Sequence, residues 1–141
     1  MKRLLLPFIL AAVVAGVFAA PAIASHPHFV KSQTPTCTSS TSDNSITVDC
    51  TGGKIAGVGT EPTRVGIDVQ GGCSNKPGHL PKGHNQAVSE PIQPNGGNIT
   101  FGPLSVTVSC PPGLDPVVGS SVTYFIVQDG QTTIVGRVPI T

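Results

Sequence analysis

Hydrophobic and polar residues alternate along much of this chain, and the alternation predicts β-strands with one buried face. Ile46, Val48 and Cys50 alternate with polar residues, and the same pattern recurs over residues 64–70 and 104–110. Beyond the N-terminal apolar stretch, no segment has the period of 3.6 residues that is typical of an amphipathic helix. We therefore expect an all-β fold in which each of these segments is a strand.

The clearest unit is a β-hairpin at the C-terminus. Residues 121–128 and 131–140 flank Asp129-Gly130, a dipeptide that suits a type I′ turn. Centring the turn there pairs Phe125 with Ile134 and Tyr124 with Val135. The side chains that we assign to the core face are Phe125, Val127, Ile134, Val138 and Ile140. Those that we place on the opposite, partly covered face are Tyr124, Ile126 and Val135.

Turn signals between the predicted strands recur at intervals of about ten residues, which is typical of a β-sandwich or a barrel. We favour an immunoglobulin-like β-sandwich of about six to eight strands that forms a single domain over residues 36–141. Residues 25–35 are expected to be an extended, partly mobile segment. Residues 71–97 are irregular; within them we expect an edge strand near residues 86–89 and an exposed loop over 71–85.

The first 24 residues have the pattern of a secretory signal peptide. Met1-Lys2-Arg3 is a basic start, residues 4–20 are apolar, and Ala22-Ile23-Ala24 is a small-x-small cleavage signal. Cleavage after Ala24 would release the protein outside the cell or into the envelope, with no membrane-spanning segment remaining. Cleavage after Ser25 and an uncleaved signal anchor are the alternatives.

Four cysteines remain after the leader, and an even number in an exported small domain predicts two disulfides. If Asp43-Asn44 is the centre of a hairpin, Cys37 and Cys50 lie directly opposite each other on neighbouring strands. The remaining pair is Cys73–Cys110, which would tie the irregular region to the strand that ends at residue 110.

Charge and motifs exclude several classes of function. Without the leader the chain has six basic and seven acidic residues, and this balance argues against nucleic acid or an anionic membrane as a partner. The carboxylates are scattered, and no nucleophile elbow or phosphate-binding loop is present. We therefore expect no catalytic residues, no enzymatic activity and no cofactor.

The histidines are the only candidates for a chemical site. His26 and His28 lie near the expected new N-terminus, while His79 and His84 lie in the irregular region. Neutral imidazoles bind Cu(II) and Zn(II) well, so a copper or zinc site is one hypothesis. The alternative, which we favour, is four unrelated surface histidines and no bound metal.

Several short segments form a recognisable set: His28-Phe29-Val30-Lys31, Val48-Asp49-Cys50-Thr51-Gly52, Lys54-Ile55-Ala56-Gly57-Val58-Gly59 and Ser109-Cys110-Pro111-Pro112-Gly113. Together they resemble a group of small secreted bacterial proteins of the actinobacterial type. The group's mature chains begin with His-Phe-Val-Lys and carry an Ala-Gly-Leu-Gly segment. The resemblance implies a secreted, β-rich protein and no particular activity.

Three functions are compatible with these features. The leading hypothesis is a secreted, non-enzymatic β-domain that serves as a structural or interaction module, with a protein partner in the envelope or outside the cell. The second is a secreted copper- or zinc-binding protein, which requires the N-terminal histidines to lie beside the 71–85 loop. The third is a small protease inhibitor that presents the proline-rich region after Cys73 as an extended segment.

Overall fold

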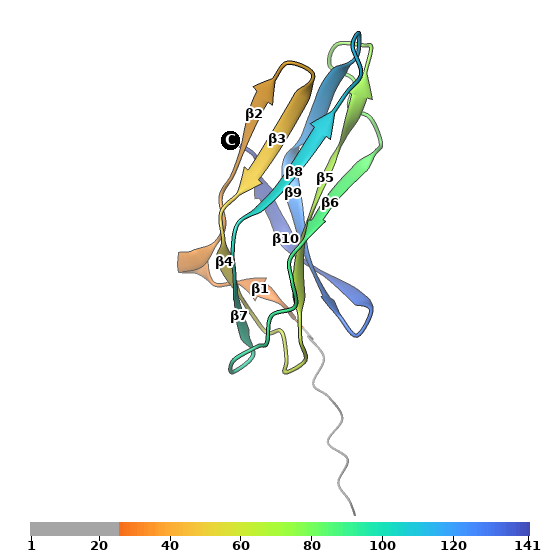
Figure 1. Ribbon diagram of the computed structural model, residues 1–141. Coiled ribbons are helices and arrows are strands. Elements are labelled where there is room, and N and C mark those ends of the chain that lie inside the picture. The colour runs from red at the N-terminus through yellow and green to blue at the C-terminus, as the bar shows by residue number, and fades with distance from the viewer. Residues whose placement is uncertain (1–25) are drawn as a thin grey trace, which may run out of the picture.

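Residues 26–141 are described in the computed structural model, and they form an all-β fold of antiparallel sheets, as the alternation predicts (Figure 1). The leader expected over residues 1–24 lies outside the described residues. The ten strands are β1 (His28–Phe29), β2 (Cys37–Ser42), β3 (Ser45–Cys50), β4 (Gly53–Ala56), β5 (Arg64–Ser74), β6 (His84–Val88), β7 (Asn98–Phe101), β8 (Leu104–Ser109), β9 (Asp115–Gln128) and β10 (Gln131–Pro139). A single 3-10 turn, η1 (Lys31–Gln33), follows β1, and no helix in the described range is long and apolar enough to cross a membrane.

The strands form three sheets with the orders β10-β9-β5-β6, β2-β3-β8 and β1-β4-β7. In Figure 1, β2, β3 and β8 lie in front of β9 and β10, while the short sheet lies towards the lower end. The strand count exceeds the predicted six to eight because β1, β4 and β7 span only two to four residues. Such short strands leave no recognisable alternation in the sequence. The other seven strands correspond to predicted ones, although β9 begins at Asp115 and not at residue 121, and β5 continues to Ser74.

One hydrophobic core joins the inner faces of all three sheets. Val48 and Val106 reach it from the front sheet, Val65 and Ile67 from β5, and Ile55 from the short sheet. The alternation predicted for β3, β5 and β8 is therefore confirmed, since the apolar positions of each strand face inward. β5 and β9 are the two inner strands of the larger sheet, and Val65, Ile67 and Val69 on β5 are fully buried.

The two disulfides match the predicted pairing. Cys37 and Cys50 are directly paired in the β2–β3 hairpin, with 4.1 Å between their Cα atoms. Asp43 adopts a positive φ of 44° at the turn, which is consistent with the turn position inferred from the sequence. The second bridge joins Cys73 near the end of β5 to Cys110 just after β8, and thereby links the two larger sheets covalently.

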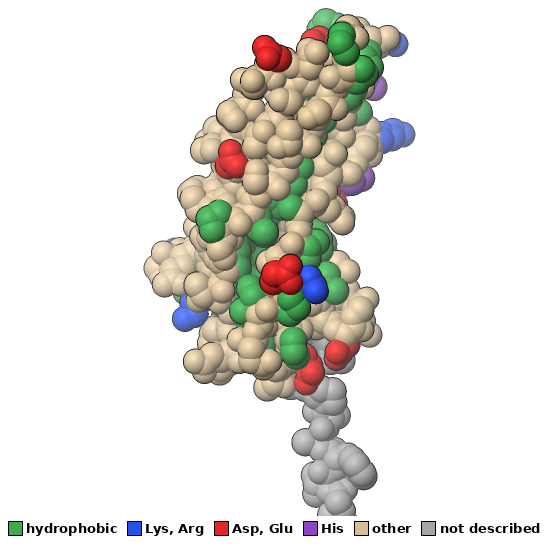
Figure 2. Space-filling model, in the orientation of Figure 1, with side chains coloured by type: hydrophobic (Ala, Val, Ile, Leu, Met, Phe, Trp, Pro, Cys, Tyr) green, Lys and Arg blue, Asp and Glu red, His purple; other side chains and the backbone are tan. Residues whose placement is uncertain are grey.

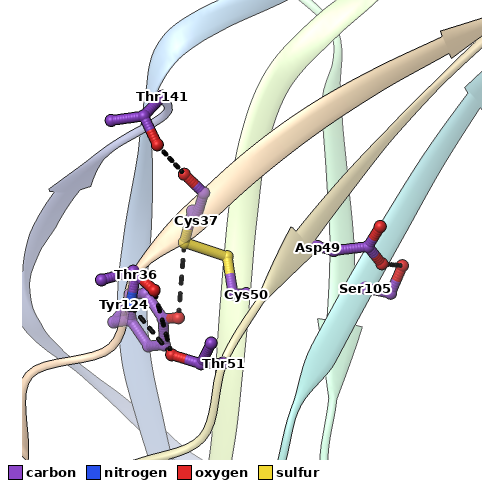
Figure 3. Close-up of a disulfide and its surroundings, with 8 residues drawn as sticks. All are labelled: Thr36, Cys37, Asp49, Cys50, Thr51, Ser105, Tyr124 and Thr141. Carbon is purple, nitrogen blue, oxygen red and sulfur yellow. Dashed lines mark hydrogen bonds between the residues drawn. A yellow bond between two sulfur atoms is a disulfide. The ribbon is translucent and has the colours of Figure 1, made fainter.

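An aromatic cluster is centred on Tyr124, and Figure 3 shows Tyr124 beside the first disulfide. Tyr124 on β9 is fully buried, and its hydroxyl lies 3.6 Å from Cys37 Sγ. The ring of Phe29 meets the Tyr124 ring edge-on at a centroid distance of 5.2 Å, and the Phe101 ring lies 5.9 Å away. Burial raises the pKa of Tyr124 far above its ordinary value, because the phenolate would lose its hydration.

This burial predicts a loss of stability at high pH. Below pH 10 the phenol is protonated in both states, so its contribution is constant; above pH 10 the unfolded chain ionises while the folded chain does not. The free energy of unfolding should therefore fall by about 1.4 kcal/mol for each pH unit above about 10. Because Tyr124 is the single tyrosine and tryptophan is absent, absorbance at 295 nm reports this group alone.

The expected result is a phenolate signal that appears only together with unfolding. In urea titrations above pH 10, the free energy of unfolding of the Tyr124→Phe variant should fall much less steeply with pH than that of the wild type. A phenolate that forms near pH 10 in the folded protein would contradict the burial of this ring.

The faces assigned to the C-terminal hairpin were partly wrong: Val138 and Ile140 lie at the core as predicted, but Phe125, Val127 and Ile134 do not. A β-bulge places Ile134 and Val138 on opposite faces. The turn forms as predicted, with positive φ at Asp129 and Gly130, and Phe125 pairs with Ile134. The register then shifts, so that Gly136 rather than Val135 pairs with Tyr124. The residues that face or pack against the core are Val122, Tyr124, Ile126, Val135, Val138 and Ile140, whereas Phe125, Val127 and Ile134 lie on the outer face. On β9, Tyr124 and Ile126 therefore face the core, while Phe125 and Val127 face outward.

Residues 26–35 are part of the fold and do not form a separate extended segment. β1 pairs with β4, the Phe29 ring enters the aromatic cluster, and Pro35 is fully buried. The N-terminal boundary of the domain therefore lies earlier than residue 36.

The irregular region is also shorter than predicted. β5 continues through Ser74 and β6 begins at His84, so the exposed loop is confined to residues 75–83. Paired residues on β9 extend β5 to this point and were not apparent from the sequence, because residues 71–74 contain no apolar alternation. The edge strand expected near residues 86–89 is present as β6.

Candidate functional site

The outer face of sheet β10-β9-β5-β6, which is turned away from the core, carries two neighbouring rows of side chains with different chemistry. Each row crosses all four strands, because the residues in it are cross-strand partners. We call Ile134, Phe125, Gly66 and Val88 the apolar row, and Arg137, Thr123, Asp68 and Gln86 the charged row.

The apolar row exposes large hydrophobic side chains at both of its ends. Ile134 is 59% exposed and Val88 is 45% exposed, and they are the two large hydrophobic side chains that are exposed in the described part of the chain. Between them the Phe125 ring lies directly over Gly66, where a Cβ atom would come within 2.1 Å of the ring. Glycine on β5 therefore lets the ring lie flat on the sheet and completes the row.

The charged row is organised around Asp68 on β5. His84 Nδ1 donates to Asp68 Oδ1 at 3.0 Å, and Gln86 Nε2 donates to Asp68 Oδ2 at 3.2 Å. Both carboxylate oxygens therefore have partners on the neighbouring edge strand β6. Arg137 lies at the opposite end of the row on β10, and its side chain makes no hydrogen bond or ion pair with any residue in the range 26–141.

A small groove opens beside the charged row, at the end of the sheet nearest the 75–83 loop. Its volume is about 190 Å³, and its lining residues are Asp68, Gln70, Leu80, His84, Gly119, Ser120, Ser121, Thr123 and Arg137. Gln70 Nε2 donates to the carbonyl of Pro81 at 3.2 Å, and the Leu80 side chain lies against Gly119. These contacts hold the loop over the sheet, so that it forms one wall of the groove.

The groove brings together Ser121, His84 and Asp68, the residue types of a hydrolytic triad. The Asp68–His84 hydrogen bond resembles the orienting pair of such a triad. Among the described residues, however, no serine hydroxyl hydrogen-bonds to His84, so the contact between nucleophile and base is missing.

The four histidines form two separate pairs. His28 Nδ1 donates to the carbonyl of His26 at 3.0 Å beside β1, near the lower end of Figure 1. His79 and His84 belong to the β5–β6 loop and β6, towards the upper end. The convergence that the metal hypothesis requires is therefore not found. Within residues 26–141, no group of three or more metal-ligating side chains is close enough to hold an ion.

The outer face of the β2-β3-β8 sheet differs from the outer face of the larger sheet. Its side chains are hydroxyls with one carboxylate: Thr38, Ser40, Ser42, Ser45, Thr47, Asp49, Ser105, Thr107 and Ser109. They hydrogen-bond to one another, as in the 2.9 Å contact between Thr47 Oγ1 and Thr107 Oγ1. Figure 2 shows this face as a largely uncharged surface. Substitutions on this hydroxyl face therefore serve as controls for substitutions in the apolar and charged rows.

The sequence did not predict the site on the larger sheet. The alternation of β5 does place Asp68 and Gln70 on the face opposite the core. Which residues of β6 and β10 would lie beside them depends on the 75–83 loop and on the β10 bulge, and neither has a clear sequence signal. Comparisons with protein-family models, with curated proteins and with solved structures found no match to this chain.

Proposed function

We propose that this chain is a secreted, non-enzymatic interaction module with an immunoglobulin-like β-sandwich fold. In this proposal a protein in the cell envelope or outside the cell docks on the apolar row. The resemblance to small secreted bacterial proteins that begin with His-Phe-Val-Lys is part of the same proposal.

Export is supported by the leader-like residues 1–24 and by the two disulfides, since disulfides persist in oxidising compartments. The immunoglobulin-like assignment is supported by antiparallel sheets of three and four strands that share one core. The bridge between Cys73 and Cys110 joins the two larger sheets, as inter-sheet disulfides of that architecture do, but it lies at the strand ends and not within the core.

The apolar row is the observation on which the docking surface rests. Exposed large hydrophobic side chains are common singly on protein surfaces, but here both exposed examples share one cross-strand row with Phe125. Phe125 itself is only 5% exposed, so the surface that a partner would contact consists of Ile134 and Val88 at the two ends of the row. An apolar centre with a polar margin is the usual composition of a protein interface. The expected partner therefore presents apolar side chains to this row.

The proposal predicts that a charge in the apolar row abolishes capture of the partner. We would immobilise the secreted chain and the Ile134→Asp variant, and compare the proteins each retains from the producing organism's culture fluid and washed cells. Ile134 is more than half exposed, so this change should leave the fold intact while placing a carboxylate in the interface. The wild type should retain a protein that the Ile134→Asp variant does not retain. The affinity of the variant for that protein should be at least tenfold lower than that of the wild type.

The matched control is Ser40→Asp, which adds the same charge to the hydroxyl face of the front sheet. It should capture the same protein as the wild type. Equal capture by Ile134→Asp and Ser40→Asp would show that the apolar row is not the docking surface.

A further inference from the structure

The groove next to the charged row has an excess of unused hydrogen-bond donors. Both oxygens of Asp68 already accept hydrogen bonds from β6 side chains, so this carboxylate is satisfied within the protein. Arg137 has five N–H donors and no partner among the described residues. The hydroxyls of Ser121 and Thr123 line the same hollow. An occupant that accepts hydrogen bonds would complete this set.

The loop beside the groove is rich in basic residues. Residues 69–89 contain no Asp or Glu, whereas the loop carries Lys76 and Lys82, both exposed. Figure 2 shows Lys, Arg and His side chains along the upper right-hand edge of the molecule. Two carboxylates lie nearby, Asp68 in the lining of the groove and Asp115 opposite Ser74 at the base of the loop. Lys76, Lys82 and Arg137 outnumber these two carboxylates, which favours an anionic group in the groove.

The size of the groove limits the ligand. A volume of about 190 Å³ corresponds to about six water molecules at ~30 Å³ each, which is below the usual range for drug-sized ligands. One sugar-sized ring with a single anionic substituent fits this space. The remaining lining, which includes Gln70, Ser120 and Ser121, offers partners for the hydroxyl groups of such a ring.

We propose that this groove binds a monosaccharide-sized molecule that carries one carboxylate or phosphate, and that the Arg137 guanidinium pairs with the anion. Arginine binds either group through two parallel N–H···O bonds, so both belong to the same ligand chemistry. The site is separate from the apolar row, and its occupancy does not depend on a protein partner.

The test is an NMR titration of the secreted, disulfide-bonded chain with glucuronate, glucose 6-phosphate and glucose. At least one of the two anions should shift the amide signals of Asp68, Ser121, Thr123 and Arg137 saturably, with half-saturation at about 1 mM or below. Glucose, which lacks the anion, should not. The anion that binds more tightly identifies whether the natural group is a carboxylate or a phosphate.

The decisive variant is Arg137→Gln, which should weaken binding by about tenfold to a hundredfold, as expected for the loss of charge-assisted hydrogen bonds. Arg64→Gln is the matched control, because Arg64 is also exposed on this sheet but donates to the carbonyl of Ser89 outside the groove. It should bind like the wild type. The proposal is overturned if neither anion binds saturably, if glucose binds equally well, or if Arg137→Gln retains full affinity.

Discussion

Replacing Cys73 and Cys110 together by alanine should lower the free energy of unfolding by about 4 kcal/mol. The bridge closes a loop with a sequence separation of 37 residues, and the chain-entropy model gives about this value for a loop of that length. It also joins the end of β5 to the end of β8, so its loss frees the two larger sheets from their covalent link. The midpoint of thermal unfolding should fall by on the order of 15 °C.

Urea unfolding followed by tyrosine fluorescence measures this change. The control is Asn75→Ala, because Asn75 is an exposed loop residue close to the bridge. This variant should unfold at the same urea concentration as the wild type. A double variant that differs from the wild type by less than about 1 kcal/mol would mean that the sheets hold together without the bridge.

Tyr124→Ala is the second change with a large expected effect. The ring is fully buried between Phe29 and Phe101 and lies against the first disulfide (Figure 3). Removing it leaves a cavity among side chains that belong to all three sheets, so we expect a loss of about 3–5 kcal/mol. Because the sole tyrosine is removed, far-ultraviolet circular dichroism in urea is the appropriate measurement.

The conservative variant Tyr124→Phe separates packing from hydrogen bonding. It keeps the ring and removes only the hydroxyl, whose partner is the weakly accepting Cys37 sulfur at 3.6 Å, so its cost should stay near 1 kcal/mol. Similar losses in Tyr124→Ala and Tyr124→Phe would contradict the packing role.

The disulfide pairing could be predicted because one turn determined the register. Asp43-Asn44 set the β2–β3 pairing, and the pairing placed Cys37 opposite Cys50. Once that bridge was assigned, Cys73 and Cys110 had no other partners. Alternation was equally sufficient for β3, β5 and β8, since each has a single buried face.

The C-terminal hairpin shows where alternation stops being sufficient. Both of its strands are apolar on both faces, so the sequence offered two nearly equivalent assignments. The bulge at Val135 brings Val138 onto the core face, while Ile134 stays on the outer face beside Phe125. Nothing in the local sequence marks this extra residue, and the choice of face depends on the aromatic cluster around Tyr124.

The groove required tertiary information of another kind. Asp68 and His84 are 16 residues apart and meet only because a nine-residue loop without a standard turn sets the β5–β6 register. Arg137 reaches the same face from β10 only because of the bulge. Sequence patterns could place Asp68 on the outer face, but they could not show which residues would surround it.

The central claim is that partners of this protein dock on the outer face of the four-stranded sheet. A photo-crosslinking amino acid placed at position 134, or at position 107 on the hydroxyl face, tests it most directly. Irradiation of each variant with the producing organism's culture fluid and washed cells should give a discrete crosslinked protein from position 134 and none from position 107. The opposite pattern, or the same product from both positions, would contradict the account.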